Sequence, residues 1–154
     1  METDLIKIIL AIVLGAAIGI ERGRSNKPVG MRTYMLITLA ATIFTMISLK
    51  ATSIFNSSQY DPGRIISQVL VGIGFIGAGV IIFNNNKLQG VTTAASIWVS
   101  TAIGMLIGLG IYSLAIIVTI ISFFIIAFLF EPEEKLEEIM NKHSKTKRTK
   151  NNRM

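Results

Sequence analysis

The sequence predicts an all-α polytopic membrane protein with five transmembrane helices. Five apolar runs of roughly membrane-spanning length follow one another, separated by turns that hold charged residues, asparagine or glycine. Hydrophobic residues make up 51% of the 154 residues. With five spans, 12 of the 15 Lys and Arg residues fall on one side of the membrane and 3 on the other. This bias places the N-terminus outside and the C-terminus in the cytoplasm.

The composition excludes several classes of protein. The length fits a single domain, and the high apolar content excludes disorder. Cysteine is absent, and the one histidine, His143, lies in the polar tail. Disulfides, a thiolate nucleophile and a Cys-based metal site are therefore excluded, and neither a Ser-His-Asp triad nor a His-based zinc site is expected. We expect no enzyme and no cofactor.

One motif suggests a nucleotide site but stands in the wrong context. Gly72-Ile-Gly-Phe-Ile-Gly77 matches the G-x-G-x-x-G pattern of dinucleotide-binding folds. That pattern functions between a strand and a helix, with an acidic residue about 20 residues later. Here it lies inside a continuous apolar run, so helix packing is the favoured interpretation.

The first predicted span covers residues 5–20 and is interrupted only by Lys7, which we expect to snorkel outward. A cleaved signal peptide is the alternative, but the chain starts with acidic rather than basic residues, which favours a retained helix. Gly15 and Gly19 form a GxxxG pair that predicts a packing face. Residues 21–32 are predicted to form a polar loop.

The second predicted span covers residues 34–55 and carries hydroxyl side chains on one face. Such a stripe can line a polar pathway. Alternatively, the hydroxyls bond to their own helix or to a neighbouring helix. Lys50 lies off the stripe and is expected to snorkel. The hydroxyl residues are Thr38, Thr42, Thr45, Ser48 and Thr52.

The third predicted span, residues 65–83, is the stretch around which the other helices are expected to pack. It holds no charged residue and follows the charged turn Asp61-Pro-Gly-Arg64. Glycines let helices approach closely in a bilayer, so they predict a central, close-packed helix. The glycines are Gly72, Gly74, Gly77 and Gly79.

The last two predicted spans differ in character. Residues 91–108 present small side chains on one face, including Gly104 and Gly108, with Trp98 roughly opposite. Residues 111–130 are the most uniformly apolar and are expected to form a peripheral, lipid-facing helix.

The composition changes after the fifth span, which divides the chain into residues 1–130, a transmembrane domain, and residues 131–154, a charged cytoplasmic tail. The tail is expected to begin as a short helix and to end as a disordered basic segment. Such a segment is attracted to anionic lipid. RNA binding is the less favoured alternative, because nothing else in the tail supports it, and we expect no nucleic-acid partner.

Few ionisable residues flank the spans, and such residues are functional candidates. Asp61 is either a cap that accepts backbone N–H groups of the third helix or a functional residue. In the functional interpretation it is the outer acceptor for a cation or proton, or it pairs with a cation on another chain. Glu21 has the same ambiguity, because nearby arginines can pair with it. Mg²⁺ usually keeps several waters and uses one or two carboxylates. A metal site at Asp61 or Glu21 is thus permitted but not indicated.

Four segments follow one another along the chain: Gly19-Ile-Glu-Arg22, Lys27-Pro-Val-Gly-Met-Arg-Thr33, the turn from Asp61 with the helix to Gly79, and Gly90-Val-Thr-Thr-Ala-Ala-Ser-Ile-Trp98. In this order they resemble the MgtC/SapB family of bacterial inner-membrane proteins. The likeness runs from about Gly15 to Gly110, and the short tail resembles the SapB-like members that lack a soluble C-terminal domain. The resemblance implies that the signature positions are Glu21, Arg22, Arg32, Thr33, Asp61, Arg64, Gln68 and Trp98.

The resemblance also implies a plasma-membrane protein linked to growth in low magnesium and, in pathogens, to survival inside macrophages. Some members are regarded as regulators of other membrane proteins, including the F-type ATP synthase. The first hypothesis is therefore a non-enzymatic regulator that packs through its glycine faces against copies of itself or other membrane proteins within the lipid bilayer. The alternative is a Mg²⁺ or proton transport protein that uses Asp61 and Glu21.

Overall fold

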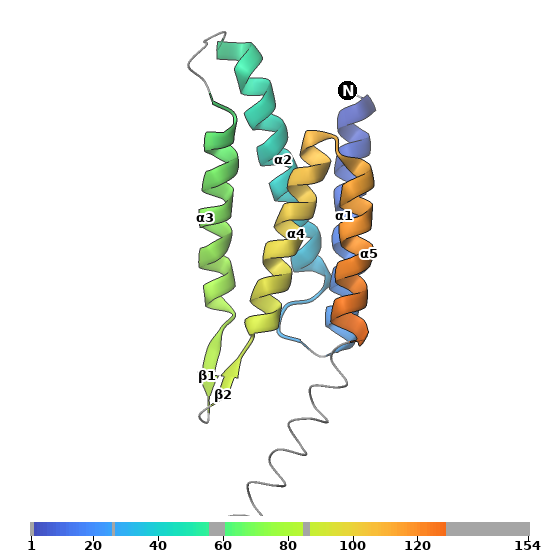
Figure 1. Ribbon diagram of the computed structural model, residues 1–154, viewed down its shortest axis with the longest axis vertical. Helices are drawn as coiled ribbons and strands as arrows, with labels where there is room; N and C mark the ends of the chain where they lie inside the picture. Colours follow the sequence, from blue (N-terminus) through green and yellow to red (C-terminus); the bar gives the residue numbers. More distant parts are fainter. Residues whose placement is uncertain (1, 26, 56–60, 85–86, 129–154) are drawn as a thin grey trace, which may run out of the picture. The chain divides into compact units, whose positions relative to one another are not determined.

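The computed structural model describes residues 2–25, 27–55, 61–84 and 87–128. The expected charged tail, residues 131–154, and the last two residues of the expected fifth span lie outside the described residues. The described chain is mainly helical, as predicted (Figure 1). Its elements are α1 (Glu2–Arg24), α2 (Met31–Phe55), α3 (Gly63–Gly79), β1 (Ile82–Asn84), β2 (Lys87–Gln89), α4 (Val91–Leu109) and α5 (Tyr112–Phe128).

Three of these helices are long and apolar enough to cross a membrane: Glu2–Arg24, Met31–Ala51 and Val91–Leu109. The other two, α3 and α5, are apolar but have only 17 residues each. At 1.5 Å per residue, 17 residues cover about 25 Å, less than the roughly 30 Å hydrocarbon core.

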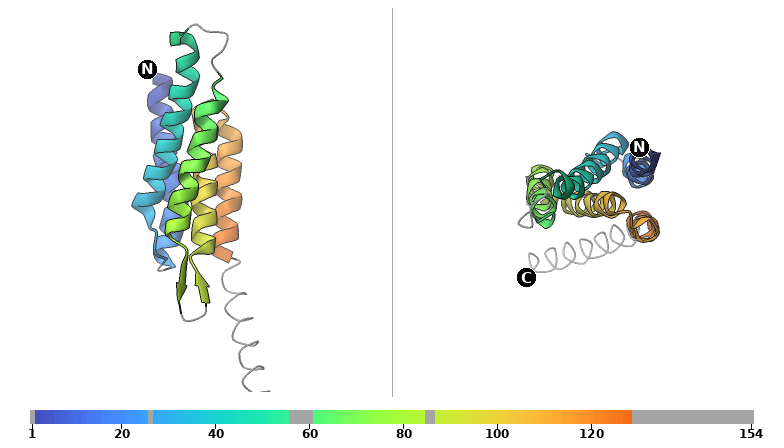
Figure 2. Two further views of the ribbon diagram at one scale, coloured as in Figure 1. Left: turned by 90° about the vertical axis from the view of Figure 1, so that its left-hand side faces the viewer. Right: turned by 90° about the horizontal axis from the view of Figure 1, so that it is seen from above.

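The chain divides into two units, Met1–Phe123 and Phe124–Met154. In the first unit, α2 packs extensively against both α1 and α4, and α3 packs against α4 and less extensively against α2. Figure 2 shows α2 and α4 lying between α1 and α3. In the second unit the described residues form the last turn of α5, where the rings of Phe124 and Phe128 stack with centroids 5.5 Å apart.

The centre of the first unit is therefore α2, and the prediction that the third helix is central is wrong. The face of α2 that meets α1 and α4 consists of Tyr34 and small or hydroxyl-bearing residues, and these side chains are almost completely buried. By contrast, α3 buries only Ile73 and Gly77 among its residues. Small side chains on α2 and glycines on its neighbours allow the backbones to approach closely.

The third helix also ends earlier than expected, at Gly79 instead of residue 83. Instead, β1 (Ile82–Asn84) pairs antiparallel with β2 (Lys87–Gln89) to form a hairpin in which Phe83 lies opposite Leu88. Aromatic and β-branched residues favour strands, and the run of asparagines that follows favours a turn. Gly90 closes the hairpin with φ 87°, where a side chain would collide with the Val80 carbonyl group.

The first helix continues past its expected end at residue 20 to Arg24, so the predicted loop over residues 21–32 is wrong in its first part. Glu21 and Arg22 are helical and buried rather than exposed at an interface. Both residue types have high helix propensity, and their pairing inside the protein favours continuation of the helix. The second helix likewise begins three residues before its predicted start, at Met31.

Candidate functional site

The two candidate carboxylates lie at opposite ends of the first unit. Glu21 is near the end of α1, whereas Asp61 immediately precedes α3, which begins at the other end (Figure 1). They therefore do not form a single site. Among the described residues, no group of three or more His, Cys, Asp or Glu side chains could hold a metal ion.

Glu21 and Arg22 form a buried ion pair. Their residues are 8% and 2% exposed, and Arg22 Nε lies 3.3 Å from Glu21 Oε2. Ser25 Oγ donates to Glu21 Oε1 at 2.7 Å. Within the described chain, Glu21 Oε2 and Arg22 Nε have no partner with hydrogen-bond geometry. The pair is thus held by charge attraction and burial, and the Glu21 carboxylate is not open to solvent.

The turn before α3 is exposed and polar. The Gly63 N–H donates to Asp61 Oδ1 at 2.8 Å, and the Arg64 N–H donates to the Asp61 carbonyl oxygen at 3.1 Å. Asp61 therefore makes the backbone contact that the capping interpretation expects. The Arg64 side chain is exposed, and no described carboxylate lies within 4.0 Å of it. Ser48 Oγ of α2 donates to the Pro62 carbonyl oxygen and ties this turn to α2.

Four hydroxyl residues of the α2 stripe, Thr38, Thr42, Thr45 and Ser48, are buried, and their hydroxyls bind backbone carbonyl groups, while the side chain of Thr52 lies outside the described part of the structure. Thr38, Thr42 and Thr45 each donate to the carbonyl oxygen four residues earlier, at 2.8–2.9 Å. Thr42 Oγ1 also lies 2.9 Å from the Gly104 carbonyl oxygen of α4. These four hydroxyls therefore make the contacts that the packing interpretation expects.

The eight glycines expected to mediate packing fall into three groups. Gly15, Gly19, Gly104 and Gly108 meet α2 so closely that an added Cβ would overlap it, for example at 2.8 Å from the Tyr34 carbonyl oxygen for Gly15. At Gly77 an added Cβ would make an ordinary contact, 3.7 Å from Ala94 Cβ. At Gly72, Gly74 and Gly79 it would meet nothing within 4 Å.

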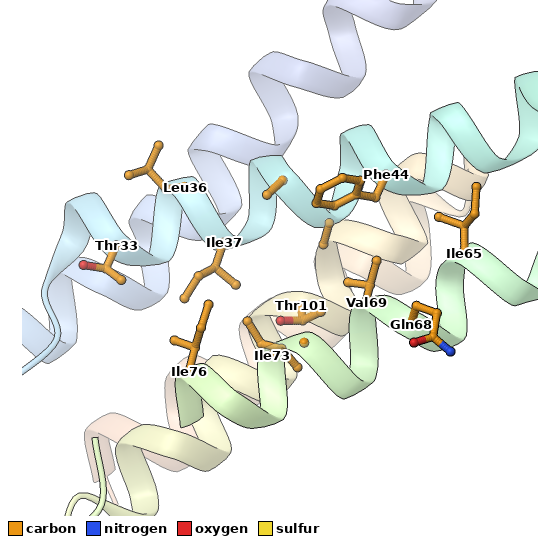
Figure 3. Close-up of a pocket in the computed structure, with 13 residues that line it drawn as sticks. Thr33, Leu36, Ile37, Phe44, Ile65, Gln68, Val69, Ile73, Ile76 and Thr101 are labelled. Atoms are coloured by element: carbon orange, nitrogen blue, oxygen red, sulfur yellow. The ribbon is translucent and has the colours of Figure 1, made fainter. Parts of the chain in front are cut away.

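The other candidate residues lie apart from one another, and three of them line two separate apolar grooves. Arg32 and Thr33 are exposed at the start of α2, and Gln68 is exposed on α3. Thr33 and Gln68 lie at opposite ends of one groove (Figure 3). Trp98 is 53% exposed and lines a second groove. The structure therefore does not gather the signature residues into one site.

The first groove, which we name the α2–α3 groove, has a volume of about 650 Å³. Ile37 and Phe44 of α2 face Ile65, Val69 and Ile76 of α3 across it (Figure 3). Its lining is apolar apart from three side chains. The complete lining is Thr33, Leu36, Ile37, Ala40, Ala41, Phe44, Ile65, Gln68, Val69, Gly72, Ile73, Ile76 and Thr101.

The second groove, the α3–α4 groove, has a volume of about 630 Å³ and a lining dominated by small residues. Trp98 is its largest side chain. The lining is Gly74, Gly77, Ala78, Ile81, Val91, Ala94, Ala95, Trp98, Val99 and Ala102. The sequence indicated the small residues but not the two grooves, because a groove depends on how far α3 stands from its neighbours.

Comparison with known proteins assigns the chain to a family. A profile of the MgtC family matches residues 8–135. The chain is 44% identical over 115 residues to the "Putative magnesium transporter YhiD" of Escherichia coli K12, covering 73% of this chain and 54% of that protein. It is 41% identical over 119 residues to a Haemophilus influenzae protein whose name states no function, covering 74% and 50%. It is 36% identical over 135 residues to "Protein MgtC" of Salmonella typhimurium, covering 88% and 56%.

The chain spans about half the length of these curated relatives. No solved structure matches it. The family match covers most of the chain, including both grooves and the candidate residues, and agrees with the long apolar helices of a membrane protein. The chain belongs to the MgtC family.

Proposed function

We propose that this protein is a non-enzymatic regulator of the bacterial plasma (inner) membrane that acts by binding a helix of another membrane protein. The observation that carries this proposal is the α3–α4 groove. Most of its lining residues are glycine or alanine, and Trp98 is half-exposed beside them.

Small residues favour helix association in a bilayer because they let backbones approach. A helix with its side chains is about 10–12 Å in diameter, so a close fit needs walls without bulky side chains. The α3–α4 groove meets this requirement over Gly74, Gly77 and Ala78 on α3 and Ala94 and Ala95 on α4. Trp98 supplies a large apolar surface of the kind that is frequent in binding hot spots.

The proposed physiological link is to magnesium limitation or a related stress. It rests on membership of the MgtC family and on the magnesium-transporter name carried by the Escherichia coli relative.

We further propose a multi-pass topology with five spans, the N-terminus outside and the C-terminus in the cytoplasm. The alternating direction of α1 to α4 and the distribution of Lys and Arg support it (Figure 1). Because the chain contains no cysteine, single cysteines can be placed in each turn and labelled from one side of intact cells. Labelling from outside is expected at the turn before α3 and not at the hairpin. The reverse pattern would refute the orientation.

The partner-binding proposal is tested with three leucine substitutions in α3. All three glycines have space for a side chain, but Gly74 lines the α3–α4 groove, Gly72 lines the α2–α3 groove and Gly79 lines neither. Membrane proteins cross-linked in cells to a probe near Trp98 are identified for each variant. We expect Gly74→Leu to lose the captured partner while Gly79→Leu keeps it. Equal capture of the partner protein by both variants would refute the proposal.

Transport of Mg²⁺ or protons is the second candidate function, favoured by the name of the Escherichia coli relative. Purified protein in liposomes either moves Mg²⁺ or H⁺ down a gradient or does not. Flux abolished by Asp61→Asn or Glu21→Gln would show that regulation is not the complete function. Absence of flux, together with a partner that is lost in Gly74→Leu, would instead refute transport as the function.

A further inference from the structure

The α2–α3 groove differs from the α3–α4 groove in ways that favour a different occupant. Most of its lining side chains are branched or aromatic, such as Ile37, Phe44, Ile65 and Val69, and small residues are in the minority. Several of these side chains are exposed, including Phe44 at 47% and Ile76 at 45%. Such walls hold two helices apart and leave an apolar space between them.

The groove is long and apolar. Along α3 it extends from Ile65 to Ile76, about 16 Å at 1.5 Å per residue. Its branched and aromatic side chains offer a surface that an extended hydrocarbon chain can follow, and they lack the continuous small-residue face that favours close helix packing.

Two oppositely charged residues, Asp61 and Arg64, lie at the start of α3, near one end of the groove. Arg64 precedes Gln68 by four residues, which places the two side chains on the same face of α3. Gln68 is exposed at the rim of the groove (Figure 3). Arg64 is exposed as well. The exposed Asp61 carboxylate stands at the start of the same helix, where it accepts from the Gly63 N–H. Ser48 holds this turn against α2 through Pro62.

This arrangement matches the chemistry of a phospholipid. A guanidinium group binds a phosphate well, and an amide one helical turn below it can donate to an ester carbonyl oxygen. A carboxylate beside the guanidinium disfavours a purely anionic headgroup but complements one that also carries an ammonium group. No described carboxylate pairs with Arg64, so its charge is available to a ligand.

We propose that the α2–α3 groove holds an acyl chain of a zwitterionic phospholipid that has a primary ammonium group, with Arg64 on its phosphate and Asp61 on its ammonium. This proposal places α3 in the apolar layer beside α2. It is independent of partner binding in the α3–α4 groove, because the two grooves lie on different sides of α3.

The first test measures retained lipid in full-length protein extracted from bacterial membranes in mild detergent, by native mass spectrometry. We expect phosphatidylethanolamine bound to the wild-type protein and a loss of about fivefold or more in Gly72→Leu, which places a side chain in the groove. Gly79→Leu is the matched control and is expected to retain the lipid, because Gly79 lies outside both grooves. Ala40→Phe fills the groove from the α2 wall and replaces Gly72→Leu should that variant not fold.

The second test measures headgroup preference. Protein is reconstituted in equal amounts of phosphatidylethanolamine, phosphatidylcholine and phosphatidylglycerol, and the lipid retained on re-extraction is compared. We expect phosphatidylethanolamine to be enriched in the wild type. Arg64→Gln is expected to lower retention of every phospholipid, by roughly threefold to fivefold for an exposed charge contact. Asp61→Asn is expected to equalise phosphatidylethanolamine and phosphatidylcholine while keeping the acceptor for the Gly63 N–H.

Three results would overturn the proposal. The first is wild-type protein that retains no phospholipid beyond the bulk composition. The second is retention that Gly72→Leu and Ala40→Phe leave unchanged. The third is a peptide, or a second copy of the chain, that is retained in the wild type and lost in both groove-filling variants.

Discussion

Lys7 donates from Nζ to the carbonyl oxygen of Gly108 at 2.7 Å, across 101 residues of sequence. The last carbonyl groups of a helix have no partner within the helix, and a cation near them also interacts favourably with the helix dipole. Lys7, a residue of α1, therefore caps the C-terminal end of α4. The expectation that Lys7 points outward to the interface is wrong, because the half-buried ammonium finds this acceptor inside the protein.

Substitution of Lys7 by methionine is expected to reduce the free energy of unfolding by about 1–2 kcal/mol. The variant keeps most of the apolar stem but leaves the Gly108 carbonyl group without its charged donor. Unfolding in a mixed detergent titration measures the change. Lys50→Met is the control, since it removes an exposed contact with Asp4 and is expected to have a smaller effect. Equal losses in the two variants would contradict the assigned role of Lys7.

Alanine substitutions at two glycines are expected to change stability in opposite directions. At Gly104 the new Cβ would overlap the Thr38 carbonyl oxygen and lie 2.8 Å from Ala41 Cβ. Overpacking of this kind costs about 1–3 kcal/mol. At Gly72 the new Cβ contacts no other atom within 4 Å, so only the gain in helix propensity remains. Gly72→Ala is therefore expected to raise the free energy of unfolding by about 0.5–1 kcal/mol. Unfolding free energies measured for both variants under the same conditions provide the test, and a loss of stability in Gly72→Ala would contradict the open space next to this glycine.

The sequence predicted the helical class and placed every helix to within a few residues of its observed centre, because long apolar runs and the turns between them are local features. It did not predict which helix is central. Glycine in a membrane helix allows close approach but does not require it, and the glycines of α3 are open at Gly72, Gly74 and Gly79. Packing at α2 depends instead on which helices meet, and that is a property of the whole fold.

The burial of Glu21 and Arg22 could not be predicted from the sequence for a related reason. Glu21 and Arg22 have the composition of a surface loop, and only their position against neighbouring helices makes them buried. Likewise, Ile82 and Phe83 continue the apolar run of the third predicted span, and this run predicts a helix, although the asparagines after them favour a hairpin. Asp61 was more predictable, because its contact with the Gly63 N–H is local.

Two threonines on the same stripe of α2 are expected to differ when replaced by valine. Thr42 Oγ1 lies 2.9 Å from the Gly104 carbonyl oxygen of α4, whereas Thr45 Oγ1 donates to Ala41 of its own helix. Interhelical hydrogen bonds in membrane proteins contribute about 0.6 kcal/mol on average. We expect Thr42→Val to cost about that much and Thr45→Val close to nothing, as measured by unfolding. A larger cost at Thr45 would contradict the interhelical role of Thr42.

Ser100 is completely buried on α4, and its hydroxyl has no hydrogen-bond partner among the described residues. A buried polar group without a partner costs roughly 1–3 kcal/mol. Ser100→Ala removes the hydroxyl and is expected to leave stability unchanged or to raise it. Ser96→Ala is the contrasting variant and is expected to destabilise the protein, because the Ser96 hydroxyl lies 2.5 Å from the Tyr34 hydroxyl. The midpoint of thermal unfolding in detergent distinguishes the two outcomes. A clear loss of stability in Ser100→Ala would point to a partner for that hydroxyl in the membrane.

The buried pair of Glu21 and Arg22 is expected to behave as a unit. Removal of one member leaves the other charge buried and unpaired, which costs roughly 3 kcal/mol or more, so Glu21→Gln and Arg22→Gln should each destabilise the protein strongly. The double variant removes both charges and is expected to be more stable than the sum of the two single losses predicts. This coupling, measured as a double-mutant cycle, also separates the two candidate functions. A structural pair gives large coupling in stability and no flux in liposomes. If Glu21 instead carries a transported ion, Glu21→Gln abolishes flux, and it does so even where Arg22→Gln is present to restore the stability of the fold.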